Sequence, residues 1–144
     1  MKRSRLLLYT GLTVLLGAAC AGDGTGLGGG DEPGTKLSTD VQPILTANCA
    51  VSGCHVGSSP PEGMNLSQGM TYANTVDVKS RQSALDRVEP SNPDLSYLVH
   101  KIQGTQLDPG VGGLSQQMPL NADPLPQSQI DLIREWIMEG AKNN

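Results

Sequence analysis

Two cysteines and a histidine fall within seven residues, in the stretch CAVSGCH from Cys49 to His55. This feature constrains the fold strongly, because three side chains that bind metals or form covalent bonds must share one short segment. Three interpretations are open at this point. The stretch is a covalent cofactor site, a metal-ligand cluster, or a disulfide loop beside an incidental histidine.

The start of the chain has the pattern of a signal peptide over residues 1–19. Basic residues precede an apolar run of about 14 residues, whereas spanning a bilayer takes roughly 20. Cys20 follows small residues and resembles the lipidated cysteine of bacterial lipoproteins, although Leu16 lies four residues before it where that family prefers three. We therefore expect an exported protein, lipid-anchored through Cys20 in the outer membrane and facing the periplasm. An ordinary signal peptide and an uncleaved signal anchor are the alternatives.

Residues 21–35 are expected to form a flexible tether, since seven of the 18 glycines lie there without apolar periodicity. One domain remains, residues 36–144. It has no Phe and a single Trp, so we expect apolar side chains alone to give a domain of this size only marginal stability. A large apolar ligand in the core would add the missing contacts.

Charge gives a weaker constraint on partners. Without the signal peptide, the chain has 7 basic and 14 acidic residues, a net charge of −7. This balance argues against nucleic acid, and against anionic lipid, as a partner of the folded part. It is compatible with a basic protein partner.

Apolar periodicity predicts three helices, over residues 37–49, 92–104 and 126–140, and no strand pattern is present. Thr39 and Gln42 have the spacing of a capping box at the first helix. The expected apolar faces are Val41, Ile44, Leu45 and Cys49; Leu95, Leu98, Val99 and Ile102; and Ile130, Ile133 and Ile137 with Leu132 and Trp136 on the flank.

The segments between these helices are rich in Gly, Ser and Pro and are expected to be loops, with a short helix around residues 80–86 as a further expectation. The fold class expected is all-α, with three to four short helices. Loops this long in a small domain usually need something that orders them.

A covalent haem would use every reactive group of CAVSGCH. Two cysteines form thioethers with the haem, and the histidine directly after the second is an axial iron ligand. The usual spacing has two residues between the cysteines, and here there are four. A second axial ligand is typically a methionine from a later loop, and Met118 in SQQMPL is so placed. Met64 and Met70 are the alternatives, while Met138 lies within a predicted helix and is expected to pack.

Several segments together resemble the class I c-type cytochrome domains of bacterial exported proteins. They are VQPILTANC and GCH, MNLS, NPDLSYLVHKI, a Met-Pro pair, and QIDLIREWIMEGA, in the family's order over residues 38–142. The resemblance implies a cytochrome c-like fold wrapped around one haem c, acting as a monohaem electron carrier for redox protein partners rather than as an enzyme. It implies Cys49 and Cys54 as thioethers, His55 as proximal ligand and Met118 as distal ligand. The four-residue gap leaves open whether Cys49 is attached.

Two other interpretations stay open. A zinc site would combine Cys49, Cys54, His55 and His100, but adjacent ligands fit one tetrahedron poorly. A Cys49–Cys54 disulfide would leave a cofactor-free, lipid-anchored binding module. A cytochrome domain could also be the electron-entry module of a larger redox enzyme complex. We expect His100 to face solvent and Trp136 to pack.

Overall fold

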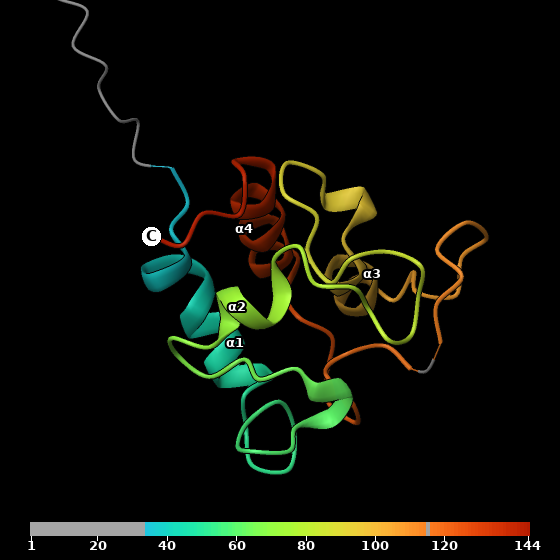
Figure 1. The fold of residues 1–144 in the computed structure, drawn as a ribbon, viewed down its shortest axis with the longest axis horizontal. Helices are drawn as coiled ribbons and strands as arrows, with labels where there is room; N and C mark the ends of the chain where they lie inside the picture. Colours follow the sequence, from blue (N-terminus) through green and yellow to red (C-terminus); the bar gives the residue numbers. More distant parts are fainter. Residues whose placement is uncertain (1–33, 115) are drawn as a thin grey trace, which may run out of the picture. The chain divides into compact units, whose positions relative to one another are not determined.

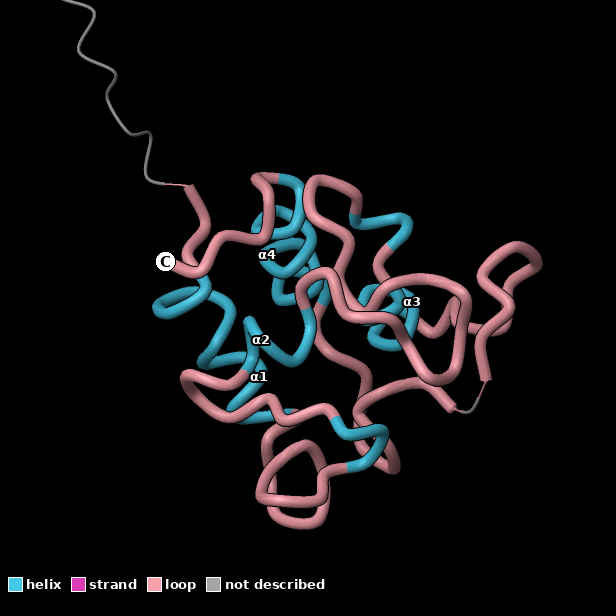
Figure 2. The backbone as a smooth tube through the Cα atoms, viewed as in Figure 1, coloured by secondary structure: helices cyan, strands magenta, loops and turns pink. Residues whose placement is uncertain are grey.

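The computed structural model describes residues 34–114 and 116–144. The predicted signal peptide, lipidated Cys20 and nearly all of the predicted tether lie outside these residues. Within them every regular element is helical, which confirms the all-α class. The elements are η1 (Leu37–Val41), α1 (Gln42–Asn48), η2 (Pro61–Gly63), α2 (Thr71–Thr75), η3 (Pro93–Leu95), α3 (Tyr97–Gln103) and α4 (Gln127–Met138). Figure 1 shows their arrangement, and Figure 2 shows how much of the domain is loop.

The core forms where α4 packs against α3 and η1. Trp136 is fully buried and its indole N–H donates to the Lys142 carbonyl at 2.9 Å, so it packs as expected. The chain end returns to the first turn, where the Ser38 N–H donates to the Asn144 carbonyl at 2.9 Å. Met138, expected to pack, is instead exposed at the end of α4. None of the described helices is long and apolar enough to span a bilayer.

The first predicted helix is present as two consecutive elements, η1 and α1, and the predicted capping box is absent. Neither element has a side-chain hydrogen bond at its N-cap. Gln42 is buried instead, and its amide donates to the Leu66 carbonyl at 2.9 Å and accepts from the Thr71 hydroxyl at 2.7 Å. The side chain assigned to a helix start therefore connects α1 to the segment before α2.

The second predicted helix is interrupted at Ser96, which is extended and separates η3 from α3. The Ser96 hydroxyl donates to the Asn92 carbonyl at 2.9 Å and accepts from the Glu89 N–H at 2.9 Å. This local pairing replaces the helical one and turns Leu95 out to solvent, against the prediction of a buried position. The helix ends at Gly104, whose φ of 81° is left-handed, as the sequence predicts.

Residues 80–86 do not form the short helix suggested by the sequence. The hydroxyl of Ser80 accepts from the Gln82 N–H at 3.0 Å, and that of Ser83 accepts from the Leu85 N–H at 3.2 Å. Such bonds compete with helical pairing and favour turns. The chain therefore reverses here, and the Arg87 N–H meets the Val78 carbonyl at 2.7 Å.

Helix α2 was not predicted, because its buried face is not apolar. Thr71 and Thr75 are its buried side chains, and the Thr75 hydroxyl donates to the Thr71 carbonyl at 2.8 Å. Periodicity of apolar residues cannot detect a helix that turns threonines inward. The Thr71 hydroxyl at its first position donates to Gln42 Oε1 of α1 at 2.7 Å.

Candidate functional site

The CAVSGCH segment forms a closed loop at the end of α1. The His55 N–H donates to the Cys49 carbonyl at 3.0 Å, and the Cys54 N–H donates to the Val51 carbonyl at 2.9 Å. Gly53 has a φ of 82°, which L side chains rarely adopt, so the turn requires glycine there. Val51 is exposed. The loop thus accommodates four residues between the cysteines while its two ends stay hydrogen-bonded.

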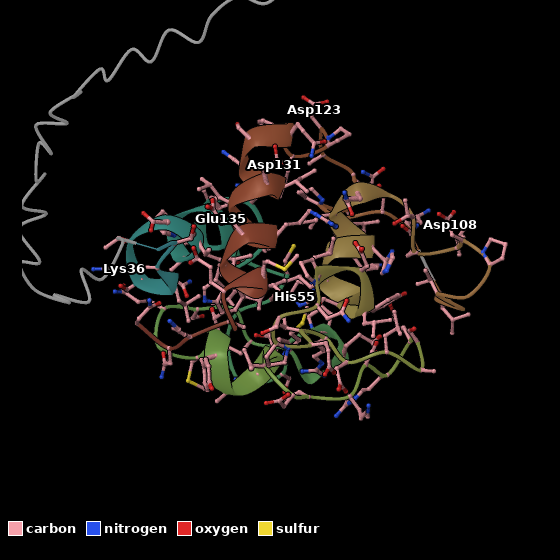
Figure 3. All side chains as sticks on the ribbon, turned by 90° about the horizontal axis from the view of Figure 1, so that it is seen from above. Lys36, His55, Asp108, Asp123, Asp131 and Glu135 are labelled. Atoms are coloured by element: carbon pink, nitrogen blue, oxygen red, sulfur yellow. The ribbon has the colours of Figure 1, made fainter. Side chains whose placement is uncertain are left out.

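Cys49, Cys54, His55 and Met118 line one cavity of about 370 Å³. Its volume lies within the roughly 300–1,000 Å³ typical of small-molecule and cofactor sites. Figure 3 shows His55 in the interior, whereas the labelled Asp108 and Asp123 lie at the periphery. The other lining residues are Asn48, Val51, Gly53, Pro61, Glu62, Met64, Leu66, Ser80, Arg81, Gln82, Arg87, Tyr97, Leu98, Lys101, Ile102, Pro119, Leu120 and Ala122.

His55 is held in the state that a metal ligand requires. Its Nδ1 lies 3.1 Å from the Met64 carbonyl oxygen, and a carbonyl only accepts, so Nδ1 carries the proton and Nε2 keeps its lone pair. Burial lowers the pKa of His55, and the nearby cations Arg87 and Lys101 lower it further. The imidazole is therefore neutral at physiological pH, with an available nitrogen.

Cys49 and Cys54 are both free thiols, Cys49 buried and Cys54 half-buried. Burial, and then the neighbouring Cys54, raises the pKa of Cys49 to about 11. Cys49 is therefore protonated at neutral pH and is not an activated thiolate nucleophile.

The structure distinguishes the methionines by position. Met118 and Met64 line the cavity, whereas Met70 does not and is exposed just before α2. Met118 is tied to α3, since its N–H donates to the Lys101 carbonyl at 2.8 Å. Met64 is tied to the Nδ1 edge of His55 through its carbonyl. Two of the three candidate methionines thus line the cavity, Met64 from a segment before α3 in the sequence and Met118 from a segment after it.

Two buried cations in the cavity wall were missed by sequence reasoning. Arg87 and Lys101 are each only 7% exposed. The Arg87 guanidinium donates to the carbonyls of Glu62 at 2.6 Å and Asn74 at 2.7 Å, and the Lys101 ammonium donates to the Gln116 carbonyl. Nothing in the sequence near either residue marks it as buried, because loops distant in sequence supply these carbonyls.

Neither cation forms an ion pair among the described residues, whose ion pairs are Lys79–Asp86 and Arg134–Asp94. The Glu62 carboxylate lines the same cavity and acts on both cations only at longer range. Burial lowers the pKa of Arg87 and of Lys101, and the Glu62 carboxylate offsets only part of that lowering. Burying a charge without a counter-charge costs free energy. An anionic group in the cavity would offset this cost, so the wall is suited to a ligand that carries carboxylates.

The zinc interpretation requires His100, and the structure places His100 elsewhere. Its Nε2 lies 3.0 Å from the Asp94 carbonyl oxygen and its Nδ1 lies 2.8 Å from the Thr105 hydroxyl. Both nitrogens are therefore engaged, and the side chain is half-buried rather than fully solvent-facing. In the part of the chain that the structure describes, no three His, Cys, Asp or Glu side chains gather as a metal site.

Comparisons with known proteins give no family for this chain. No family model matches the sequence, and no curated protein matches it. Among solved structures, hydrazine synthase of Kuenenia stuttgartiensis is similar with a TM-score of 0.47 and 24% sequence identity, over 74% of this chain and 16% of that chain. The functional interpretation therefore depends on the cavity and its residues.

Proposed function

We propose that this chain is a monohaem c-type cytochrome that carries single electrons. The observation that carries the proposal is that Cys49, Cys54, His55 and Met118 line one cavity. These are the residue types that a covalent haem with histidine and methionine ligands uses. They come from two segments more than sixty residues apart in sequence, and their convergence on one cavity is a property of the fold.

The cavity fits haem in two further respects. The buried residues Leu66, Leu98 and Ile102 line it and belong to the core, so a macrocycle there would extend the core that the aromatic-poor sequence cannot fill. Arg87 and Lys101 are buried cations in the same wall, and neither forms an ion pair among the described residues. Haem propionates are carboxylates, and they would supply the counter-charge.

The roles of individual residues follow from their hydrogen bonds. Cys49 and Cys54 would form the thioethers, and His55, with its open Nε2, would be the proximal ligand. Met118 is the better candidate for the distal ligand, because the Met64 backbone carbonyl is bonded to the Nδ1 edge of His55, away from the nitrogen that would bind iron. Haem supplies a one-electron couple when bound, and methionine ligation raises its potential. The chain contributes ligands, exclusion of water and buried positive charge.

The remaining expectations are part of the same proposal. Export and a lipid anchor on Cys20 would hold the domain at the outer membrane on the periplasmic side, where haem c is attached in bacteria. A basic redox protein is the partner suggested by the acidic composition. The chain alone would transfer electrons without being an enzyme, or would serve as the electron-entry module of a larger redox complex.

Haem attachment is tested by producing the chain with cytochrome c maturation machinery and extracting it with acidified organic solvent. We expect the colour to stay with the polypeptide, and single variants Cys49→Ser and Cys54→Ser to show which sulfurs are attached. Colourless protein with a Cys49–Cys54 disulfide would refute the proposal and favour the cofactor-free binding module.

The distal ligand is tested by Met118→Ala in the haem-loaded protein. We expect the thioether–iron charge-transfer band to disappear and the reduction potential to fall, because the sulfur favours reduced iron. Met138→Ala, at an exposed methionine, is the matched control and should keep the band. Survival of the band in Met118→Ala with its loss in Met64→Ala would assign the ligand to Met64.

A further inference from the structure

The chain segment that carries Met118 is fastened to α3 at Tyr97. The Tyr97 hydroxyl donates to the Leu114 carbonyl at 2.8 Å and accepts from the Leu114 N–H at 3.1 Å. The ring lies against Gly113, where an added Cβ would be 2.5 Å from Tyr97 Cε2 and 2.4 Å from the Gln106 carbonyl oxygen. One buried side chain therefore binds both polar groups of one loop residue and forbids a side chain at the residue before it.

A second set of bonds joins the same helix to the residues nearest Met118. Lys101, four residues after Tyr97 and so on the same face of α3, donates from its ammonium to the Gln116 carbonyl. The Lys101 carbonyl accepts from the Met118 N–H at 2.8 Å. The Gln117 side-chain amide donates to the Ile102 carbonyl at 3.1 Å. The path from Leu114 to Met118 is thus bonded to α3 at both of its ends.

Side-chain burial does not account for the position of this segment. Leu114 is 61% exposed, and Gln116 is also exposed, so neither is held by apolar contacts. Figure 1 shows the preceding loop projecting beside α3. What fixes the approach to Met118 is therefore the set of hydrogen bonds from α3, in which Tyr97 and Lys101 are the buried side chains.

We propose that Tyr97 and Lys101 are positioning residues that hold Met118 in the cavity and so set how readily an external ligand replaces it. The proposal rests on the proposed role of Met118 as distal ligand. A neutral hydrogen bond is worth roughly a two- to tenfold change in an equilibrium. Loss of both Tyr97 hydroxyl bonds should therefore favour the released loop by about tenfold or more.

The test titrates haem-loaded Tyr97→Phe with imidazole and follows the loss of the thioether–iron charge-transfer band. Phenylalanine keeps the ring against Gly113 and removes only the hydroxyl. We expect about tenfold tighter apparent imidazole binding than in the wild type. Tyr72→Phe, at an exposed tyrosine of α2, is the matched control and should leave the affinity unchanged.

A second variant, Gly113→Ala, keeps the hydroxyl but displaces the loop from Tyr97, and it should shift imidazole binding in the same direction. Wild-type imidazole affinity in both variants, with the haem still attached, would overturn the proposal. If the wild-type chain takes up no haem, the proposed function fails. Amide hydrogen exchange in the haem-free chain then tests separately whether Tyr97 holds the segment that carries Met118. Tyr97→Phe should speed exchange at Leu114 and Met118, and unchanged rates would refute the positioning role of Tyr97.

Discussion

Replacing Thr71 by valine removes one hydroxyl from a buried hydrogen-bond chain that ends at the backbone of His55. The Thr71 hydroxyl donates to Gln42 Oε1 at 2.7 Å, and Gln42 Nε2 donates to the Leu66 carbonyl at 2.9 Å. The Leu66 N–H then donates to the His55 carbonyl at 2.8 Å. This series of hydrogen bonds links α1, α2 and the candidate site, so breaking it tests how the fold supports that site.

The expected magnitude follows from burial. Thr71 is 1% exposed and Gln42 is 5% exposed, so water cannot replace the lost donor at Gln42 Oε1. A buried acceptor left without a partner costs about 1–3 kcal/mol of unfolding free energy. Replacing the partner instead, Gln42→Leu, leaves the Thr71 hydroxyl 3.1 Å from the Leu66 carbonyl, to which it can donate a hydrogen bond. Unpaired polar groups therefore contribute less to the cost of Gln42→Leu.

Urea unfolding followed by circular dichroism measures this cost, with wild type and variants compared in the same haem state. Thr46→Val is the matched control: it removes a hydroxyl that also bonds Gln42, at 3.0 Å, but from an exposed position. We expect a change of at most about 0.5 kcal/mol for the control. A Thr71→Val protein as stable as the control would show that the buried hydroxyl contributes nothing and that the reasoning is wrong.

Three further predictions concern stability. Burial lowers the pKa of His55 when folded, so the unfolded chain takes up the proton first and haem-free protein should lose stability as pH falls below about 6.5; His55→Asn should flatten this loss in urea midpoints measured at pH 7 and about pH 5. On α4, Ile133→Ala should cost about 2–5 kcal/mol because Ile133 is fully buried, whereas the exposed Leu132→Ala should cost about 0.5 kcal/mol or less; equal thermal shifts would contradict this assignment. Asp94→Asn breaks the pair with Arg134 at 2.8 Å and, since Asp94 is exposed, should change stability by about 1 kcal/mol or less, with any loss shrinking in high salt.

The sequence was most informative where one face of a helix is apolar and the helix ends in glycine. The stripe of Ile130, Ile133 and Ile137 predicted α4, and Gly104 marked the end of α3. Local pattern also singled out the CAVSGCH segment and the later methionines as the reactive groups of the chain. These conclusions depend only on residues close in sequence, so they can be drawn without the tertiary structure.

The sequence misled where local polar bonds decided the conformation. Serine hydroxyls turned residues 80–86 into a chain reversal, and Ser96 separated η3 from α3. Threonines rather than apolar residues face inward from α2, which left no periodicity to detect. In the first two cases a serine hydroxyl competes with helical hydrogen bonding, and the outcome depends on which backbone groups the fold brings near.

The sequence by itself determined which residues carry reactive groups and where the apolar helices lie. Only the tertiary structure decided which of those groups share a cavity: Met118 and Met64 reach it, while Met70 and His100 do not. It also buried Arg87 and Lys101 without an ion pair among the described residues, a state that no local pattern encodes. The physical reason is that burial and charge compensation depend on segments far apart in the chain, which meet only in the folded domain, where α4 packs against α3 and η1.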